Sequence, residues 1–189
     1  MTQTIRADAP RGEWSEASEP FASAALRLGA HEFAAEFPGA YLCFLASPLG
    51  VSDEEPALPP TKRLLVEREG AAIPSEEALK LYVVPIVKRE GANPFPMMIT
   101  VGRAANNDVQ VPAADVSQLH GHFSRDGEGW VITDVGSTNG TFLGGERLKL
   151  RAPVPVELGT MIVFGSIETR ILEGASLYEL LQPRAHESE

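Results

Sequence analysis

The chain has 189 residues, which fits one domain or one domain with a small appendage. Its 26 acidic side chains outnumber the 16 basic ones and give a formal net charge of −10. This balance argues against a protein that mainly binds DNA or RNA, because affinity for nucleic acid phosphates comes mostly from Lys and Arg. A hydrophobic share of 43% is ordinary for a globular protein and excludes disorder throughout the chain.

The cysteine content and the apolar runs indicate the cellular environment. Cys43 is the only cysteine, so a disulfide within the chain and a zinc site of four cysteines are both excluded. The longest apolar run, Ala40 to Ala46, is far shorter than the roughly 20 residues that span a bilayer. The N-terminus shows no secretory signal. We therefore expect a soluble, cytoplasmic protein that does not bind membranes.

The negative charge is concentrated at the two ends of the chain. Residues 1–60 contain three basic and nine acidic side chains, net −6, and residues 173–189 contain one and four, net −3. Residues 97–172 contain six and eight, net −2. This pattern predicts a near-neutral central domain, which can carry a local anion site, between acidic flanks.

The N-terminal part of the chain is predicted to contain a disordered start, a helix, a strand and a linker. Residues 1–19 are polar and lack a hydrophobic period, which is typical of disorder. A helix is predicted from Pro20 to the stop signal Pro38-Gly39. Its apolar residues recur at spacings of four, three and four on one face: Leu26, Ala30, Phe33 and Phe37. This face is predicted to be buried against the rest of the protein. Tyr41 to Ala46 is predicted to be a buried strand, and Ser47 to Pro60, with four prolines and an acidic run, a solvated linker.

From Leu81 onward, short segments rich in Val and Ile alternate with turn signals, which predicts strands. These segments are Leu81–Lys88, Met97–Val101, Phe123, Trp130–Asp134, Thr141–Leu143, Glu146–Leu148, Met161–Phe164 and Glu168–Leu172. The clearest turns are Asp126-Gly127-Glu128-Gly129 and Gly144-Gly145, where glycine accepts a positive φ. Strands this short, with turns roughly every 8 to 12 residues, indicate an all-β sandwich or barrel. Leu177 to Leu181 is predicted to form a short C-terminal helix.

Four groups of polar residues stand out in this β region. They are Gly102-Arg103, Ser117-Gln118-Leu119-His120, Asp134, and Ser137-Thr138-Asn139-Gly140-Thr141. In this order and spacing they resemble the forkhead-associated (FHA) domain, a phosphothreonine-peptide-binding module, over about residues 80–173. The flanking Asn107-Asp108-Val109 and Gly159 to Gly165 agree with this resemblance.

The resemblance implies an all-β fold, an FHA-like (SMAD/FHA) β-sandwich of antiparallel strands. We expect it to carry a small α/β N-terminal appendage and the short C-terminal helix. The expected division is a disordered N-terminus over 1–19, a helix/strand appendage and proline-rich linker over 20–80, the FHA domain over 81–174, and a short helix with a disordered tail over 175–189.

The chemistry of the four groups suits a phosphorylated ligand. A phosphothreonine carries about −1.5 to −2 charges and three strong acceptor oxygens, so its site needs a cation and several neutral donors. Arg103 offers a rigid fork of N–H donors, and Ser117 offers a short hydroxyl donor. Thr138 and Asn139 lie in a turn, where their side chains can bond either phosphate or the main chain of an extended peptide.

The resemblance also implies a role for each residue. The expected phosphopeptide-binding residues are Arg103, Ser117, Gln118, Thr138 and Asn139. The expected site-structuring residues are Gly102, His120, Asp134 and Gly140. Gln118 departs from the family pattern, because many members carry a basic residue there. A neutral Gln donates a hydrogen bond but adds no charge, so we expect modest affinity.

Two catalytic or metal-binding interpretations compete with this one. Ser117, His120 and Asp134 could form a hydrolase triad, but Ser117 lacks the G-x-S-x-G context of a nucleophile. His120 and His122 could bind a metal, but no third ligand accompanies them at a suitable spacing. There is no G-x-x-x-x-G-K-[ST] or G-x-G-x-x-G motif, so no nucleotide or other cofactor is expected.

We therefore expect a non-enzymatic adaptor in Ser/Thr kinase signalling. Its partners would be phosphothreonine-containing proteins, either substrates of a Ser/Thr kinase or the kinase itself. The alternative is a phosphorylation-independent scaffold that uses another face of the same sandwich or the N-terminal part. Gln118 and the acidic flanks favour this alternative.

Overall fold

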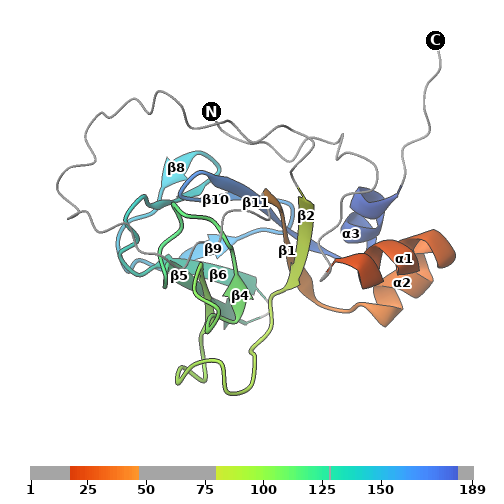
Figure 1. Cartoon of the computed structure of the whole chain (residues 1–189), viewed down its shortest axis with the longest axis horizontal. Coiled ribbons are helices and arrows are strands. Elements are labelled where there is room, and N and C mark those ends of the chain that lie inside the picture. Colours follow the sequence, from red (N-terminus) through yellow and green to blue (C-terminus); the bar gives the residue numbers. More distant parts are fainter. Residues whose placement is uncertain (1–17, 47–79, 128, 183–189) are drawn as a thin grey trace, which may run out of the picture.

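The structure, a computed structural model, describes residues 18–46, 80–127 and 129–182. In these ranges the strands form two sheets, and the helices lie together at one side of the molecule beside β1, β2 and β11 (Figure 1). The larger sheet has the order β2 (Lys80–Pro85), β1 (Ala40–Ala46), β11 (Ile167–Glu173), β10 (Met161–Phe164), β7 (Thr141–Leu143) and β8 (Glu146–Arg147). The smaller sheet has the order β4 (Val109–Gln110), β3 (Ile99–Gly102), β5 (Gly121–Asp126), β6 (Gly129–Asp134) and β9 (Val154–Val156). Neighbouring strands are antiparallel except for the β3–β4 pair.

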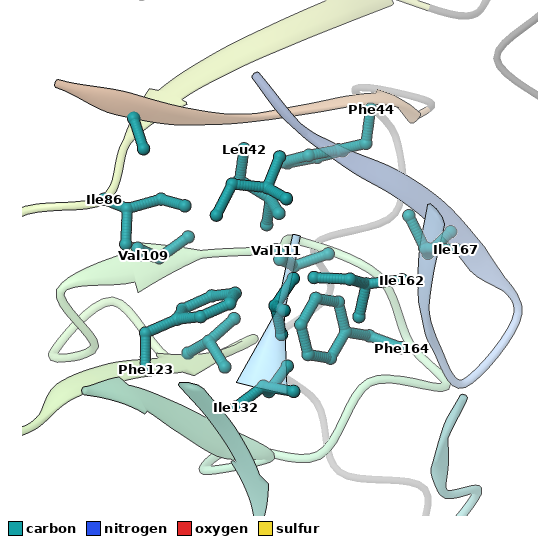
Figure 2. Close-up of a cluster of buried hydrophobic side chains, with 14 of the residues drawn as sticks. Leu42, Phe44, Ile86, Val109, Val111, Phe123, Ile132, Ile162, Phe164 and Ile167 are labelled. Atoms are coloured by element: carbon teal, nitrogen blue, oxygen red, sulfur yellow. The ribbon is translucent and has the colours of Figure 1, made fainter. Parts of the chain in front are cut away.

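The core between the two sheets is apolar. Leu42, Phe44, Ile162 and Phe164 of the larger sheet pack with Val109, Phe123 and Ile132 of the smaller sheet, and all seven are fully buried (Figure 2). Burying an aliphatic or aromatic side chain of this size contributes roughly 1.5–3 kcal/mol. The predicted β-sandwich is therefore confirmed, with its core between two mostly antiparallel sheets.

Strand β1 is covered on both faces. Leu42 and Phe44 point into the sandwich core, whereas Tyr41 and Cys43 point into a second apolar cluster beneath the helices. A strand buried on both faces needs a continuous apolar sequence, which explains why Ala40–Ala46 lacks polar alternation. Burial also raises the pKa of the Cys43 thiol to about 12, so the thiol is unreactive.

The position of β1 differs from the sequence-based expectation. We grouped this strand with the N-terminal appendage, but it is hydrogen-bonded to β2 on one side and to β11 on the other. It is therefore an internal strand of the larger sheet. Sequence periodicity does not report such a pairing, because the partners lie some 40 and more than 120 residues away. The domain boundaries themselves stay a prediction.

Two short helices replace the single N-terminal helix that the sequence predicted. They are α1 (Glu19–Arg27) and α2 (Ala30–Glu36), separated by Leu28 and Gly29, which adopt extended conformations. The Glu32 carboxylate accepts the Gly29 N–H at 3.2 Å and caps α2. The break changes the helical phase. Phe33 is fully buried as predicted, but the predicted burial of Leu26 was wrong, since this residue is 70% exposed.

The helices form a layer over the outer face of the larger sheet. The short helix predicted at the C-terminus is present as α3 (Gly174–Leu181), and its Leu177 and Leu181 pack with Phe33. Ser18, within the segment predicted to be disordered, is buried, and its Oγ accepts the Val83 N–H of the edge strand β2 at 2.7 Å. No helix in the described ranges is long and apolar enough to cross a membrane.

Most of the predicted strands are present within one or two residues, but β4 and β9, which have two and three residues, were missed. The turn predicted at Gly144-Gly145 is confirmed, with φ values of 57° and 90°. The turn predicted at 126–129 includes residue 128, which lies outside the described residues. The predictions for residues 1–17, 47–79 and 183–189 also lie outside them.

Candidate functional site

Three connections meet at one end of the sandwich, here called the loop end. They are residues 103–108 after β3, residues 111–120 between β4 and β5, and residues 135–140 between β6 and β7. The Arg103 N–H donates to the Ser117 carbonyl oxygen at 3.0 Å, and the Thr138 N–H donates to Ser117 Oγ at 3.0 Å. The fold therefore brings Arg103, Ser117 and Thr138 together from three separate parts of the sequence.

The Arg103 guanidinium is held in place through Nε, the nitrogen nearest the aliphatic part of the side chain. Its Nε donates to the Val116 carbonyl oxygen at 3.1 Å, and its own carbonyl accepts from Gln110 Nε2 at 3.0 Å. Within the part of the chain that the structure describes, its terminal N–H groups make no hydrogen bond or ion pair. The guanidinium is therefore oriented by one bond while its outer donors stay available.

Ser117 and Thr138 present two adjacent hydroxyl groups. The Ser117 Oγ accepts the Thr138 N–H, and the two hydroxyl oxygens lie 3.5 Å apart, which is long for a hydroxyl hydrogen bond. Thr138 is exposed and Ser117 is half-buried. Both hydroxyl protons can therefore turn toward an acceptor that enters beside Arg103.

His120 is fully buried beneath these loops and connects two of them. Its Nδ1 accepts the Ser117 N–H at 3.1 Å, so the proton of the neutral ring is on Nε2, which donates to the Gly140 carbonyl oxygen at 3.2 Å. Burial lowers the pKa of His120, and the opposing effects of the Gly140 carbonyl and of the Asp134 and Asp115 carboxylates do not reverse this. A neutral ring at this position orders the loops.

Asp134 anchors the loop that carries Thr138. Its Oδ1 accepts the N–H groups of Gly136 and Ser137 at 2.8 and 2.9 Å, and its Oδ2 accepts the hydroxyls of Ser137 and Thr141, both at 2.6 Å. Burial alone would raise the pKa of Asp134, but these hydrogen bonds outweigh it and lower the pKa to about 2. Ser137 was not among the predicted site residues, although its Oγ also accepts the Gly140 N–H at 3.0 Å and closes the turn.

Asn139 makes a link within the protein. Its Nδ2 donates to the Asp115 carbonyl oxygen at 2.7 Å, and the Asp115 carboxylate in turn accepts the Ser166 N–H at 2.6 Å. Asn139 therefore ties the 135–140 loop to the 111–120 loop beside the Ser117–Thr138 pair. Asp115 was missed by the sequence analysis, because nothing in its local pattern distinguishes it from a surface carboxylate.

Two glycines at this end leave no room for a Cβ. A Cβ on Gly102 would collide with the carbonyl oxygens of Gln118 and Ser117, and these backbone atoms cannot step aside. Gly140 has a φ of 88°, and a Cβ there would lie 2.6 Å from Arg147 Nε. Any side chain at position 102 would therefore push the Arg103 and Ser117 connections apart.

Gln118 contributes its main chain to the site. Its carbonyl oxygen accepts from the Ala104 N–H at 3.3 Å and from Asn107 Nδ2 at 2.6 Å, whereas its side chain is exposed beside Ser117. Asn107 is buried and also donates to the Ala104 carbonyl oxygen at 2.9 Å. Asn107, which the sequence pattern placed outside the site, joins the loop after Arg103 to the loop after Ser117.

A buried carboxylate supports the first of the three loops from below. Asp108 pairs with Lys88 Nζ at 3.0 Å and accepts the N–H groups of Arg89 and Thr100, each at 2.8 Å, as well as Asn93 Nδ2 at 2.9 Å. Burial raises the pKa of Asp108, but these bonds outweigh it and hold the pKa well below its usual range. The Asp108 network was also missed, since its partners come from a connection without a recognisable pattern.

The geometry does not support the catalytic alternative. The Ser117 Oγ is bonded to Thr138, and both nitrogens of His120 are engaged by backbone groups, so the ring cannot take the serine proton. Asp134 Oδ2 lies 4.0 Å from His120 Nε2 and is saturated by two hydroxyls. Within the described ranges, no three His, Cys, Asp or Glu side chains gather as metal ligands.

The fold is a β-sandwich with a polar loop end, and comparison with known proteins identifies this domain. The model of the FHA domain matches residues 99–165, so the chain contains an FHA domain. The chain is 35% identical over 74 residues to the FHA domain-containing protein FhaB of Mycobacterium tuberculosis. That match covers 38% of this chain and 46% of the relative, so the chain spans about half the length of the curated relatives it matches.

Solved structures also match. A structure of Mycobacterium tuberculosis EmbR in complex with a low affinity phosphopeptide is 29% identical, with a TM-score of 0.38, over 42% of this chain and 20% of that one. The FHA domain of an Arabidopsis thaliana hypothetical protein is 21% identical, with a TM-score of 0.43, over 79% and 92%.

Proposed function

We propose that this chain is a non-enzymatic adaptor that binds phosphothreonine-containing proteins in Ser/Thr kinase signalling. The observation that carries the proposal is the set of donors at the loop end. Arg103 is fixed through Nε with its outer N–H groups available, and the Ser117 and Thr138 hydroxyls lie beside it. A phosphate monoester has acceptors only, and it matches a set that consists of one cation and neutral donors.

The proposed mechanism is a charge-dependent capture. Arg103 donates two N–H groups to phosphate oxygens, and Ser117 donates its hydroxyl to a third position on the same group. An unmodified threonine offers neither the charge nor the three oxygens. Because a hydrogen bond to a charged group contributes about 1.5–3 kcal/mol, we expect phosphorylation to increase affinity by about 10- to 150-fold.

Calorimetric titration with paired peptides tests the proposal. A library of phosphothreonine peptides and their unmodified twins is titrated into the wild-type chain, and at least one phosphorylated member is expected to bind more tightly than its twin. Because the second phosphate pKa is about 6, that binding should weaken below this pH. Equal affinity for every pair of twins overturns the proposal.

The proposed partners are proteins phosphorylated by a Ser/Thr kinase, or the kinase itself. This proposal is supported by the resemblance to the FHA family, whose members bind phosphothreonine, and by the arrangement of Arg103, Ser117 and Thr138. Gln118 and Asn139 complete the proposed peptide-binding set, with Gln118 exposed where it can meet the peptide main chain. Phosphoproteins retained by the wild type and lost by Arg103→Ala identify these partners.

A phosphorylation-independent scaffold is the second candidate function. The connection from β2 to β3 exposes apolar side chains, which are Val87, Phe95, Met97 and Met98. Met97 is 84% exposed, and the buried Asp108 network holds the connection in place. If partners bind this connection and not the loop end, Arg103→Ala retains them in a pull-down whereas Phe95→Ala with Met97→Ala loses them.

A further inference from the structure

The segment after β8 returns to the loop end of the sandwich. Strand β7 starts beside Gly140 and runs away from the site, and β8 runs back along it, with the Leu148 N–H donating to the Thr141 carbonyl oxygen at 2.9 Å. The chain then crosses to the smaller sheet, where Val154 of β9 pairs with Ile132 of β6. Residues 147–152, which start at the last residue of β8 and are here called the crossing segment, therefore pass beside the candidate site.

The crossing segment is fastened to the loop that carries Thr138. The Arg151 N–H donates to the Asp134 carbonyl oxygen at 2.8 Å. The Leu150 side chain lies against Gly136, since a Cβ on this glycine would be 3.4 Å from Leu150 Cδ1. A peptide that reaches Thr138 therefore meets this segment next.

The crossing segment is basic and its charges are uncompensated. Arg147, Lys149 and Arg151 are exposed, and none of them forms an ion pair with another described residue. The carboxylates placed close to this segment are Glu146, which is exposed, and Asp134, whose carboxylate already accepts the Ser137 and Thr141 hydroxyls. The proposed site itself supplies one cation, Arg103, for a group of about −2 charges. The crossing segment therefore offers further positive charge, in addition to Arg89, which donates to the Ala105 and Asn107 carbonyl oxygens of the 103–108 connection.

Arg151 occupies a backbone conformation that an arginine rarely adopts. The Ala152 N–H donates to the Lys149 carbonyl oxygen at 3.1 Å, which makes Arg151 the third residue of a β-turn. Its φ is 56°, and it is the one non-glycine residue with a positive φ in the described ranges. Glycine or asparagine is usual at such a turn position. Backbone strain that is retained beside a binding site motivates a functional role for the side chain.

We propose that the crossing segment is a second recognition element of the peptide site and selects phosphothreonine segments flanked by Asp or Glu. Lys149 and Arg151 attract the flanking carboxylates, and exposed Leu150 contacts the aliphatic part of the same peptide. This inference rests on the proposed phosphothreonine binding. It adds that the partner carries its phosphothreonine within an acidic segment.

Two phosphothreonine peptides that differ only at the flanking positions, Glu in one and Gln in the other, test this inference. At low ionic strength the wild type should bind the Glu peptide about two- to thirtyfold more tightly, because two exposed charge pairs contribute about 0.2–1 kcal/mol each. The preference should shrink at high salt. The double variant Lys149→Gln with Arg151→Gly should lose the preference for the Glu peptide but should still bind both phosphopeptides.

The controls separate loss of charge from loss of structure. Arg151→Gly suits the positive φ, so the melting temperature should be maintained or increased. Arg170→Gln removes an exposed charge on β11 and should leave the preference intact. Equal binding of the two phosphopeptides by the wild type, or an unchanged preference in the double variant, overturns this inference and leaves the proposed function standing. Failure of every phosphopeptide in the library to bind better than its unmodified twin overturns the proposed function itself.

Discussion

The helix-covered side of the larger sheet and the loop end of the sandwich are stabilised by different interactions. Beneath the helices, the contacts are mainly apolar packing, with Phe33, Tyr41, Leu172 and Leu177 among the buried side chains. At the loop end, Asp134, His120 and Asn107 hold the connections by buried hydrogen bonds. Packing stabilises the fold as a whole, whereas directional bonds orient the loops and leave the outer donors of Arg103 available. The following variants test this contrast through the free energy of unfolding, from the largest expected effect to the smallest.

Phe33→Ala should destabilise the fold most. Phe33 is fully buried, with its ring 4.9 Å from that of Phe37 and 5.6 Å from that of Tyr178, and removing such a side chain from a core usually costs about 3–5 kcal/mol. Urea denaturation measures this loss. Phosphopeptide affinity per folded molecule should not change. The control is Leu26→Ala on α1, which is 70% exposed and should change stability by less than about 0.5 kcal/mol.

Asp134→Ala should destabilise the fold less than Phe33→Ala does, but it should disturb the loop end more. It leaves the Ser137 and Thr141 hydroxyls and two backbone N–H groups without their acceptor, for which we expect about 2–3 kcal/mol. Asp134 makes no proposed contact with the ligand, yet phosphopeptide affinity should fall because the Thr138 loop loses its anchor. Denaturation and titration of the same sample measure both effects. Loss of stability with unchanged affinity contradicts the anchoring role.

Acid should remove the Asp134 contribution without any substitution. The carboxylate has a pKa of about 2 in the folded chain against an ordinary value near 3.9, so its contribution is complete above about pH 4 and is lost as the pH falls toward 2. The expected loss in the free energy of unfolding is on the order of 2 kcal/mol. Asp134→Asn removes the titrating group, so its stability should fall less steeply across this range when both proteins are measured by denaturation. Parallel pH profiles would show that the Asp134 hydrogen bonds do not stabilise the charged form.

The sequence predicted the sandwich better than it predicted the supports of the site. Arg103, Ser117 and Thr138 are brought together as the resemblance implied, because their motifs lie at strand ends in a family-specific order. Asn107 and Asp115 were missed, since their roles depend on the approach of loops that no local pattern encodes.

Local periodicity was least informative in the N-terminal part. The break at Gly29 shifted the buried face away from Leu26, and the pairing of β1 with β11 could not be read from a run of apolar residues. Helix phase and strand pairing both depend on contacts distant in sequence.

The most direct test of the account is calorimetric titration of one phosphothreonine peptide into the wild type and into Arg103→Ala, with the unfolding free energy of each measured on the same material. Arg103 is half-buried and makes one side-chain hydrogen bond in the described structure, so its loss should change stability by about 1 kcal/mol or less. The affinity should fall by about tenfold or more, because a charge-assisted phosphate contact is removed. Equal affinities in two equally folded proteins would contradict the claim that the loop end binds phosphate through Arg103.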